Sequence, residues 1–142
     1  MSTNPPVPRR AGDPALSQAV TRSIRVEVAS EFVPGRSNPS VPEYFFAYHV
    51  RVSNEGDETV QLVSREWLIT DGEGRVERVR GEGVVGEKPV LAPGETFEYT
   101  SFCPLATPYG SMHGSYLLVT GGGDTFRAEI APFALNASGT LH

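Results

Sequence analysis

Hydrophobic and polar residues alternate with a period of two along most of the chain. In residues 22–30 (RSIRVEVAS), Ile24, Val26 and Val28 would point to one side and the charged residues between them to the other. Residues 44–52 (YFFAYHVRV) repeat the pattern with aromatic residues and valines at alternate positions. No segment of ten or more residues shows the 3.6-residue period of a helix. The pattern therefore predicts β-strands that bury one face.

Turn-forming residues separate these segments. The stretches 71–74 (DGEG), 91–95 (LAPGE) and 121–124 (GGGD) combine glycine with aspartate or proline, which favours tight turns. The predicted strands are RSIRVEVAS (22–30), YFFAYHVRV (44–52), TVQLVSREWLIT (59–70), RVERVR (75–80), TFEYTS (96–101), SYLLVT (115–120) and TFRAEIAPF (125–133). Their number and spacing predict an all-β fold, an immunoglobulin/fibronectin type III-like β-sandwich of about seven antiparallel strands. A small closed barrel is the rival arrangement.

One strand changes phase along its length. Val60 and Leu62 share one parity, whereas Trp67 and Ile69 have the opposite one. An extra residue in one strand of a pair restores the inward direction, so a β-bulge or break is expected near Ser64. A single tryptophan in a sandwich most often anchors the core, and we expect this of Trp67.

Proline punctuates the N-terminal part of the chain. Residues 1–20 hold four prolines among small and polar residues, which predicts a disordered tail before one β-sandwich domain over 21–142. Residues 32–42 hold three more prolines, so we expect a surface loop without helix or ladder. Neither a signal-peptide apolar region nor a run of eighteen apolar residues occurs, which argues against secretion and membrane insertion.

Composition narrows the class of partner. The net charge is −5, and lysine is nearly absent, so the chain lacks the clustered basic residues that bind nucleic acid. Only one cysteine, Cys103, is present, which excludes an intramolecular disulfide and fits a cytoplasmic location. We expect Cys103 to be a small, partly buried hydrophobic residue.

Residues 81–86 read GEGVVG, the G-x-G-x-x-G spacing of dinucleotide-binding loops. A working fingerprint needs a helix that opens at the third glycine, but Pro89 and Pro93 follow and exclude one. Glu82 and Glu87 would also repel a phosphate. A nest of backbone amides could still hold an anion, so phosphate binding stays open beside a purely conformational role for the glycines.

Metal and catalytic motifs are absent from the sequence. The three histidines share no ligand spacing, and one cysteine cannot build a cysteine-rich zinc site, so we expect no resident metal or cofactor. A divalent-ion site assembled in space from Glu82, Glu87, Asp71 or Glu73 stays open. No nucleophile, base and acid occur at a recognised spacing, so no catalytic residue is expected and the chain is interpreted as a non-enzyme.

Five motifs occur in order over about residues 22–142. They are YFFAYHVRVSN, the arginine and tryptophan of SREWLITDGEG, VRGEGVVGEKPVLAPGETFEYTS, ATPYGSMHGSY, and the terminal histidine after Thr140 and Leu141. Together they resemble the bacterial ApaG family. The matching positions are Arg65, Trp67, Gly81, Glu82, Gly83, Val84, Val85, Gly86, Pro93, Gly94, Thr107, Pro108, Gly110, Met112, Gly114 and Tyr116. Glu66 departs from the family, where an aromatic residue or histidine is common, and so does the Phe102-Cys103-Pro104 stretch.

The resemblance implies a fibronectin type III-like sandwich and a connection to cobalt tolerance and magnesium efflux. Related domains in eukaryotic F-box proteins and in a DNA-polymerase-δ-interacting protein serve protein contacts, and the family has no established catalytic residues. We therefore expect a binding module with an unidentified protein partner. The expected binding surface comprises Gly81, Glu82, Gly83, Gly86, Thr107, Pro108, Gly110, Met112 and Gly114, while Arg65, Trp67, Pro93, Gly94 and Tyr116 are expected to be structural. A sensor of phosphate compounds or divalent cations that uses the GEGVVG loop is the alternative.

Overall fold

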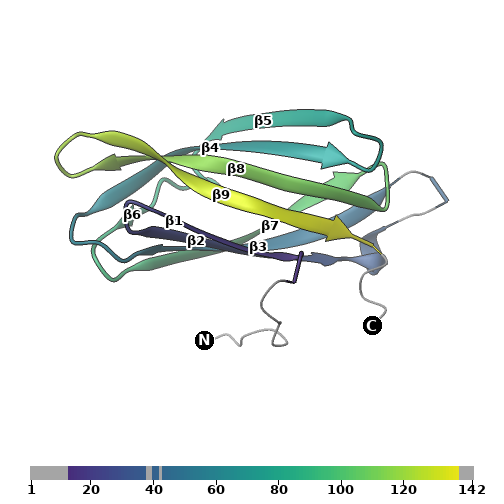
Figure 1. The fold of residues 1–142 in the computed structure, drawn as a ribbon, viewed down its shortest axis with the longest axis horizontal. Coiled ribbons are helices and arrows are strands. Elements are labelled where there is room, and N and C mark those ends of the chain that lie inside the picture. The colour runs from purple at the N-terminus through teal and green to yellow at the C-terminus, as the bar shows by residue number, and fades with distance from the viewer. Residues whose placement is uncertain (1–12, 38–39, 42, 138–142) are drawn as a thin grey trace.

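The computed structural model describes residues 13–37, 40–41 and 43–137, and within them the chain folds as a sandwich of two antiparallel sheets (Figure 1). One sheet has the order β1-β2-β3-β7, and the other has the order β5-β4-β8-β9, with the short β6 also paired to β4. The elements are β1 (Leu16–Thr21), β2 (Ile24–Phe32), the single-turn 3-10 helix η1 (Pro34–Arg36), β3 (Tyr44–Asn54), β4 (Val60–Asp71), β5 (Val76–Glu82), β6 (Val90–Leu91), β7 (Thr96–Leu105), β8 (Tyr109–Thr120) and β9 (Thr125–Asn136). The prediction of an all-β sandwich is confirmed.

Alternation along the strands places the core where the sequence predicts it. In β2, Ile24, Val26 and Val28 are at most 2% exposed, and the same parity of β3 is buried opposite them in register. Trp67 is 2% exposed, and its ring lies edge-on to Tyr48, with the ring centroids 5.2 Å apart. The two sheets therefore bury their inner faces around Trp67, as expected of a sandwich.

The phase change in β4 is a β-bulge. The pairing between β4 and β8 shifts by one residue between Leu62 and Ser64, so that Leu62 and Trp67 both point into the core despite their opposite parity. The expected hairpin turn at DGEG also forms, because the amide of Asp71 donates to the carbonyl of Arg75 at 2.9 Å. Both local predictions are confirmed.

The structure corrects the prediction for the N-terminal segment. Residues 1–12 lie outside the described part of the chain, but β1 (Leu16–Thr21) includes residues 16–20, which the sequence analysis assigns to a disordered tail. This strand pairs with β2 from Leu16↔Ala29 to Thr21↔Ile24. The last proline of the N-terminal segment is Pro14, so no proline within β1 prevents a ladder. The sequence of β1, LSQAVT, alternates only weakly, so its pairing with β2 is not evident from periodicity.

Two smaller differences concern short elements. The sequence predicts about seven strands, and the structure adds β1 and the two-residue β6 to them within the described residues. The 32–42 loop contains η1, in which Pro34 occupies the first turn, where its missing N–H group costs no hydrogen bond. Positions 38, 39 and 42 of that loop lie outside the described residues.

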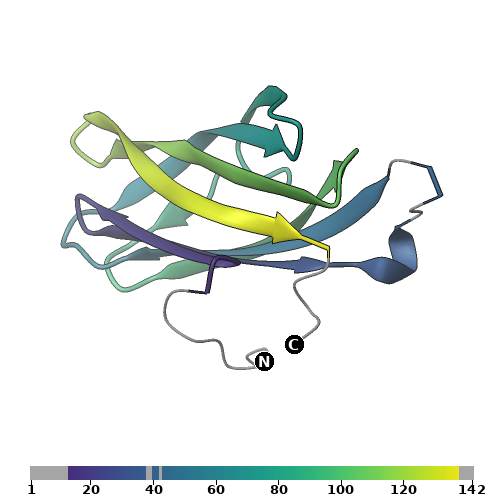
Figure 2. The ribbon, with the colours of Figure 1, turned by 45° about the vertical axis from the view of Figure 1, so that its right-hand side comes forward.

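The sandwich closes on one side and stays open on the other. Where β1 meets β9 (Figure 2), the amide of Ala134 donates to the carbonyl of Pro14 at 2.6 Å, and the Ser30 hydroxyl donates to the Ala134 carbonyl at 2.6 Å. On the opposite side, β5 and β7 each pair on one edge only within the described residues. Among those residues, no helix has the length and apolarity needed to cross a membrane.

Candidate binding surfaces

The GEGVVG segment is a tight turn whose amides bind carbonyl oxygens of the protein itself. The amide of Gly83 donates to the carbonyl of Val63 at 2.9 Å. Val84 and Glu87 exchange two backbone hydrogen bonds of 2.8 and 2.9 Å, which close a two-residue loop over Val85 and Gly86. The amides of Gly83, Val84 and Glu87, which an anion would need, therefore already bind carbonyl oxygens. The described chain continues from this turn into β6 rather than into a helix.

Glycine at position 83 is required by both conformation and space. Its φ is +64°, and a Cβ atom there would lie 2.3 Å from the carbonyl oxygen of Glu87. The turn also drives Val84 into the core, where it is fully buried, and leaves Val85 54% exposed at the tip. The glycines of this motif thus build a turn that inserts one valine into the sandwich.

Arg65 holds the turn from the inner side of β4. Its Nη1 atom donates to the carbonyl of Gly83 at 2.8 Å and to that of Glu82 at 3.1 Å. Gly81 pairs with Arg65 in register and leaves room for its guanidinium group, because a Cβ atom at Gly81 would lie 2.7 Å from Nη2. The arginine and the glycine of the motif therefore fit each other.

The second motif, TPYGSMHG, lies at the start of β8. The hydroxyl of Thr107 accepts from the amide of Gly72 at 2.8 Å and donates to the carbonyl of Tyr109, so Thr107 fastens the β4–β5 hairpin turn to the β7–β8 turn. Met112 is 1% exposed within the core. A Cβ atom at Gly114 would lie 2.0 Å from the carbonyl oxygen of Glu66. The residues of this motif therefore mainly stabilise the packing of β4 against β8 and the turn that precedes β8.

The residues expected to form one binding surface do not lie together. Gly81 pairs with Arg65, whereas Gly110 pairs with Asp71, six positions farther along β4. At about 3.4 Å per residue, Gly81 and Gly110 are roughly 20 Å apart along the strand, although Gly114 pairs with Trp67, only two positions from Arg65. The expected joint surface is therefore wrong in its geometry: its loops lie at opposite ends of the β4–β5 hairpin, and Met112 is not accessible to a partner.

The remaining family positions have structural surroundings. Pro93 and Gly94 form the turn before β7, in which the Gly94 amide donates to the Asn54 carbonyl at 2.8 Å. Tyr116 is fully buried, and its hydroxyl is hydrogen-bonded to that of Tyr99. Pro108 is half-buried between β7 and β8, and Gly86, with a φ of +82°, closes the GEGVVG turn.

The acidic residues considered for a divalent ion are also separated. Asp71 accepts from Arg75 at 2.9 Å in the β4–β5 turn, while Glu82 accepts from Lys88 at 2.9 Å at the far end of β5. The Lys88 hydrogen bond lowers the pKa of the Glu82 carboxyl. In the described part of the chain, no three His, Cys, Asp or Glu side chains gather as metal ligands would.

Three tyrosines, Tyr48, Tyr99 and Tyr116, place hydroxyl groups within the core. Burial raises the pKa of Tyr116 well above its ordinary value and also raises the pKa of Tyr99 and of Tyr48. Cys103, 4% exposed, is the buried hydrophobic residue that the sequence predicts, and burial raises the pKa of its thiol to about 11. A thiol with that pKa carries little thiolate at neutral pH, so it is a poor nucleophile.

The outer face of the four-stranded sheet carries a surface that the sequence analysis missed. Phe45 and Phe102 lie side by side on it, with ring centroids 5.7 Å apart, and the Arg36 guanidinium of η1 lies 4.2 Å from the Phe45 ring centroid. Phe102 is 47% exposed. Their outward parity in β3 and β7 was readable from the sequence, because apolar residues at outward positions break the usual alternation.

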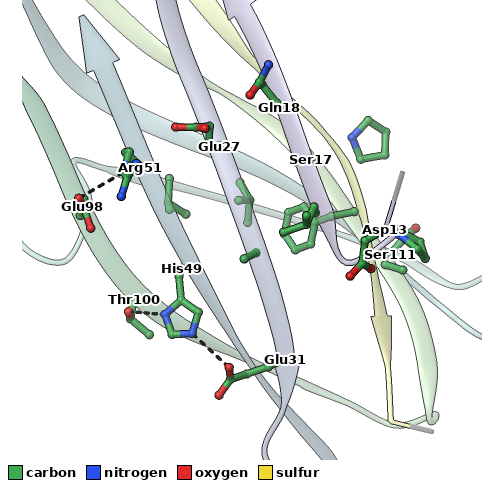
Figure 3. A pocket seen from close by; sticks show the side chains of 18 of the residues that line it. Asp13, Ser17, Gln18, Glu27, Glu31, His49, Arg51, Glu98, Thr100 and Ser111 are labelled. Carbon is green, nitrogen blue, oxygen red and sulfur yellow. Dashed lines mark hydrogen bonds and ion pairs between the residues drawn. The ribbon is translucent and has the colours of Figure 1, made fainter. Parts of the chain in front are cut away.

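A groove of about 1260 Å³ follows the same face toward the seam between β1 and β9 (Figure 3). His49 contacts Thr100 at 2.8 Å and lies 3.7 Å from Glu31, and Arg51 binds Glu98 at 3.2 Å. The charged and polar residues labelled along the groove in Figure 3 include Asp13, Gln18, Glu27, Glu31, His49, Arg51, Glu98 and Thr100. We call this groove, together with Phe45 and Phe102, the outer-face groove.

The outer face of the other sheet gathers arginines around one carboxylate. Glu66 on β4 accepts from Arg78 on β5 at 2.7 Å. Arg80 on β5 and Arg127 on β9 approach the same carboxylate at 3.6 and 3.9 Å. These side chains come from three strands, so only the assembled sheet brings them together. The sequence analysis noted Glu66 only as a departure from the family pattern.

Fold and surface together define a two-sheet β-sandwich protein whose glycine motifs build turns and whose outer faces carry the exposed side chains. The ApaG domain model matches residues 34–120 of the chain. The chain belongs to the ApaG family.

Curated relatives agree with this assignment along most of the chain. The ApaG protein of Beijerinckia indica subsp. indica is 53% identical over 122 residues, which are 86% of this chain and 94% of that protein. The ApaG protein of Rhodospirillum centenum is 56% identical over 118 residues, 83% of this chain and 91% of that protein.

Solved structures have the same fold. The crystal structure of the putative ApaA protein from Bordetella pertussis is 54% identical, covers 80% of this chain and 92% of its own, and superposes with a TM-score of 0.78. The C-terminal domain of wzt, at 12% identity and a TM-score of 0.54, has a similar fold only.

Proposed function

We propose that this ApaG protein is a non-enzymatic module that binds a protein partner through the outer-face groove. The observation that carries the proposal is the pair of aromatic rings on the same sheet face, with Phe102 47% exposed beside the half-buried Phe45. The solvent face of an antiparallel sheet is ordinarily polar, and contiguous exposed apolar surface marks an interaction site.

Charge and backbone geometry describe the partner. Asp13, Glu27, Glu31 and Glu98 line the groove, where Arg51 binds Glu98 and His49 lies 3.7 Å from Glu31. The groove therefore favours basic side chains on the partner. Within the described residues β7 pairs only with β3, so its other edge offers backbone groups to an added strand. The partner that fits is an extended polypeptide segment with basic residues and one apolar anchor near Phe102.

The biological setting is part of the proposal. We propose that the module acts in the cytoplasm, on a protein that takes part in divalent-cation homeostasis, in keeping with the cobalt tolerance and magnesium efflux that the family resemblance implies. The alternative, a phosphate or cation sensor that uses the GEGVVG loop, has less support because the amides of Gly83, Val84 and Glu87 already bind carbonyl oxygens.

Complementation tests the proposal in cells that lack their own ApaG gene. Phe102→Asp and Glu31→Lys should lower growth in cobalt toward that of the deletion strain and should abolish crosslinking to the partner captured by the unaltered protein. Val76→Asp is the matched control, because Val76 is 61% exposed and lies on the other sheet. Thermal unfolding of each purified variant verifies that it folds. If all three folded variants restore growth equally and retain the crosslinked protein, the outer-face groove is not the binding surface.

A further inference from the structure

The cluster around Glu66 carries more positive charge than its own carboxylate neutralises. Arg78, Arg80 and Arg127 contribute three positive charges, and Glu66 contributes one negative charge. Glu129, the next carboxylate in register across β8, forms no ion pair in the described part of the chain. Even when Glu129 is counted, the face keeps an excess positive charge, although the whole chain is acidic at −5.

Two of the three arginines keep their hydrogen-bond donors available. Only Arg78 makes a hydrogen bond to Glu66, whereas the closest nitrogens of Arg80 and Arg127 lie 3.6 and 3.9 Å from the carboxylate, outside hydrogen-bond distance. Arg127 also donates to the hydroxyl of Ser115 at 3.2 Å. Each guanidinium has five N–H donors, so most of them can bind a further acceptor. Glu66 thus gathers the arginines without saturating them.

A hollow of about 500 Å³ lies beside the cluster. Arg80 and Arg127 line it from two sides, together with Ser64 and Glu66. Glu82 also lines the hollow, but its carboxylate is paired with Lys88 at 2.9 Å. The hollow is therefore basic where the two arginines face it. A space of this volume admits a small molecule rather than a protein segment.

From this arrangement we infer that the outer face of the β5-β4-β8-β9 sheet is a binding site for the phosphate group of a small molecule. The excess positive charge of the arginines attracts an anion, and planar guanidinium groups bind phosphate oxygens through paired hydrogen bonds. The phosphate would lie between Arg80 and Arg127, and Ser64 would offer a hydroxyl donor. The hollow borders the GEGVVG motif at Gly81 and Glu82, but the proposed site uses side chains rather than the amides of the turn, and it lies on the opposite sheet from the outer-face groove.

Titration of the full chain with inorganic phosphate, pyrophosphate and adenosine monophosphate tests the site. The nuclear magnetic resonance signals of the Arg80 and Arg127 Nε–H groups should shift saturably at low millimolar ligand, and the dissociation constant should rise with salt. The relative affinities distinguish free phosphate from a phosphate ester, and saturable shifts with any of the three support the site. No saturation by 10 mM of all three ligands at low salt would overturn it.

A pair of double variants separates the site from general charge effects. Arg80→Gln with Arg127→Gln should weaken binding at least tenfold. Arg25→Gln with Arg51→Gln removes the same charge from the opposite sheet, where both arginines make exposed ion pairs, and should change binding less than twofold. Equal weakening by both pairs would show that only net charge matters and would refute the site. Circular dichroism spectra confirm that each double variant is folded.

Discussion

The hydrogen bonds from Arg65 to the GEGVVG turn predict that removing its guanidinium group lowers the stability of the fold. Arg65→Met keeps most of the length and apolar bulk of the side chain but removes the Nη1 donor that serves the carbonyls of Glu82 and Gly83 at 3.1 and 2.8 Å. A hydrogen bond with a charged partner contributes about 1.5 to 3 kcal/mol. Because one nitrogen serves both carbonyls, we expect a total loss of about 2 to 3 kcal/mol rather than twice that value.

The expected shift in melting temperature follows from chain length. At about 2.1 cal/mol/K per residue, a chain of 142 residues unfolds with an entropy near 0.3 kcal/mol/K. A loss of about 2 to 3 kcal/mol then lowers the melting temperature by roughly 7 to 10 °C. Thermal unfolding followed by circular dichroism measures this directly, and urea titration at 25 °C gives an independent free energy.

Two further variants serve as controls for the effect of Arg65→Met on stability. Arg51→Met removes an exposed ion pair to Glu98 and should cost at most about 1 kcal/mol, or about 3 °C. Arg65→Lys keeps a positive charge but not the planar donor geometry, so it should recover only part of the loss. If Arg65→Met melts no lower than Arg51→Met, the turn is held by its own backbone hydrogen bonds, and the stabilising role of Arg65 is wrong.

Two other predictions concern the core and its edges. Gly114→Ala should destabilise the protein by roughly 3 kcal/mol in urea titration, because the new Cβ atom would meet the Glu66 carbonyl at 2.0 Å; unchanged stability would mean that β4 and β8 can separate at no cost. Burial raises the pKa of Tyr48, Tyr99 and Tyr116, so these groups stabilise the fold fully below pH 10, and the stabilisation falls as pH rises above 10, when tyrosines of the unfolded chain ionise first. Each group should contribute up to about 1.4 kcal/mol per pH unit, measured by urea unfolding between pH 8 and 11. Full tyrosinate absorbance at 295 nm from a still folded chain would contradict this explanation.

Much of the architecture follows from local chemistry that the sequence displays. The period-two alternation places Ile24, Val26 and Val28 inside, and the phase change between Leu62 and Trp67 locates the bulge near Ser64. These features are readable because a strand exposes opposite faces at successive residues, so each side chain's direction depends on its neighbours along the chain. The family motifs were readable because they are short stretches of sequence in a fixed order.

Structural features that depend on contacts between residues far apart in the sequence could not be predicted from the sequence. Residues 16–21 form β1 only because β2 supplies its ladder and β9 lies beside it, and local composition alone favoured an unstructured tail. Likewise, Arg80 and Arg127 are 47 positions apart in sequence and meet at Glu66 only through strand register. Such contacts depend on which strands become neighbours, which periodicity does not encode.

The GEGVVG motif shows where the two kinds of information divide. The sequence by itself determined that no helix follows the motif, because Pro89 and Pro93 exclude one, and that its glycines permit unusual backbone angles. Only the tertiary structure decided where the amides go: the Gly83 amide meets the carbonyl of Val63 on β4, and the guanidinium of Arg65 caps the turn. The physical reason is that a buried polar group must find a partner, and that partner belongs to a strand 17 or more residues earlier in the chain.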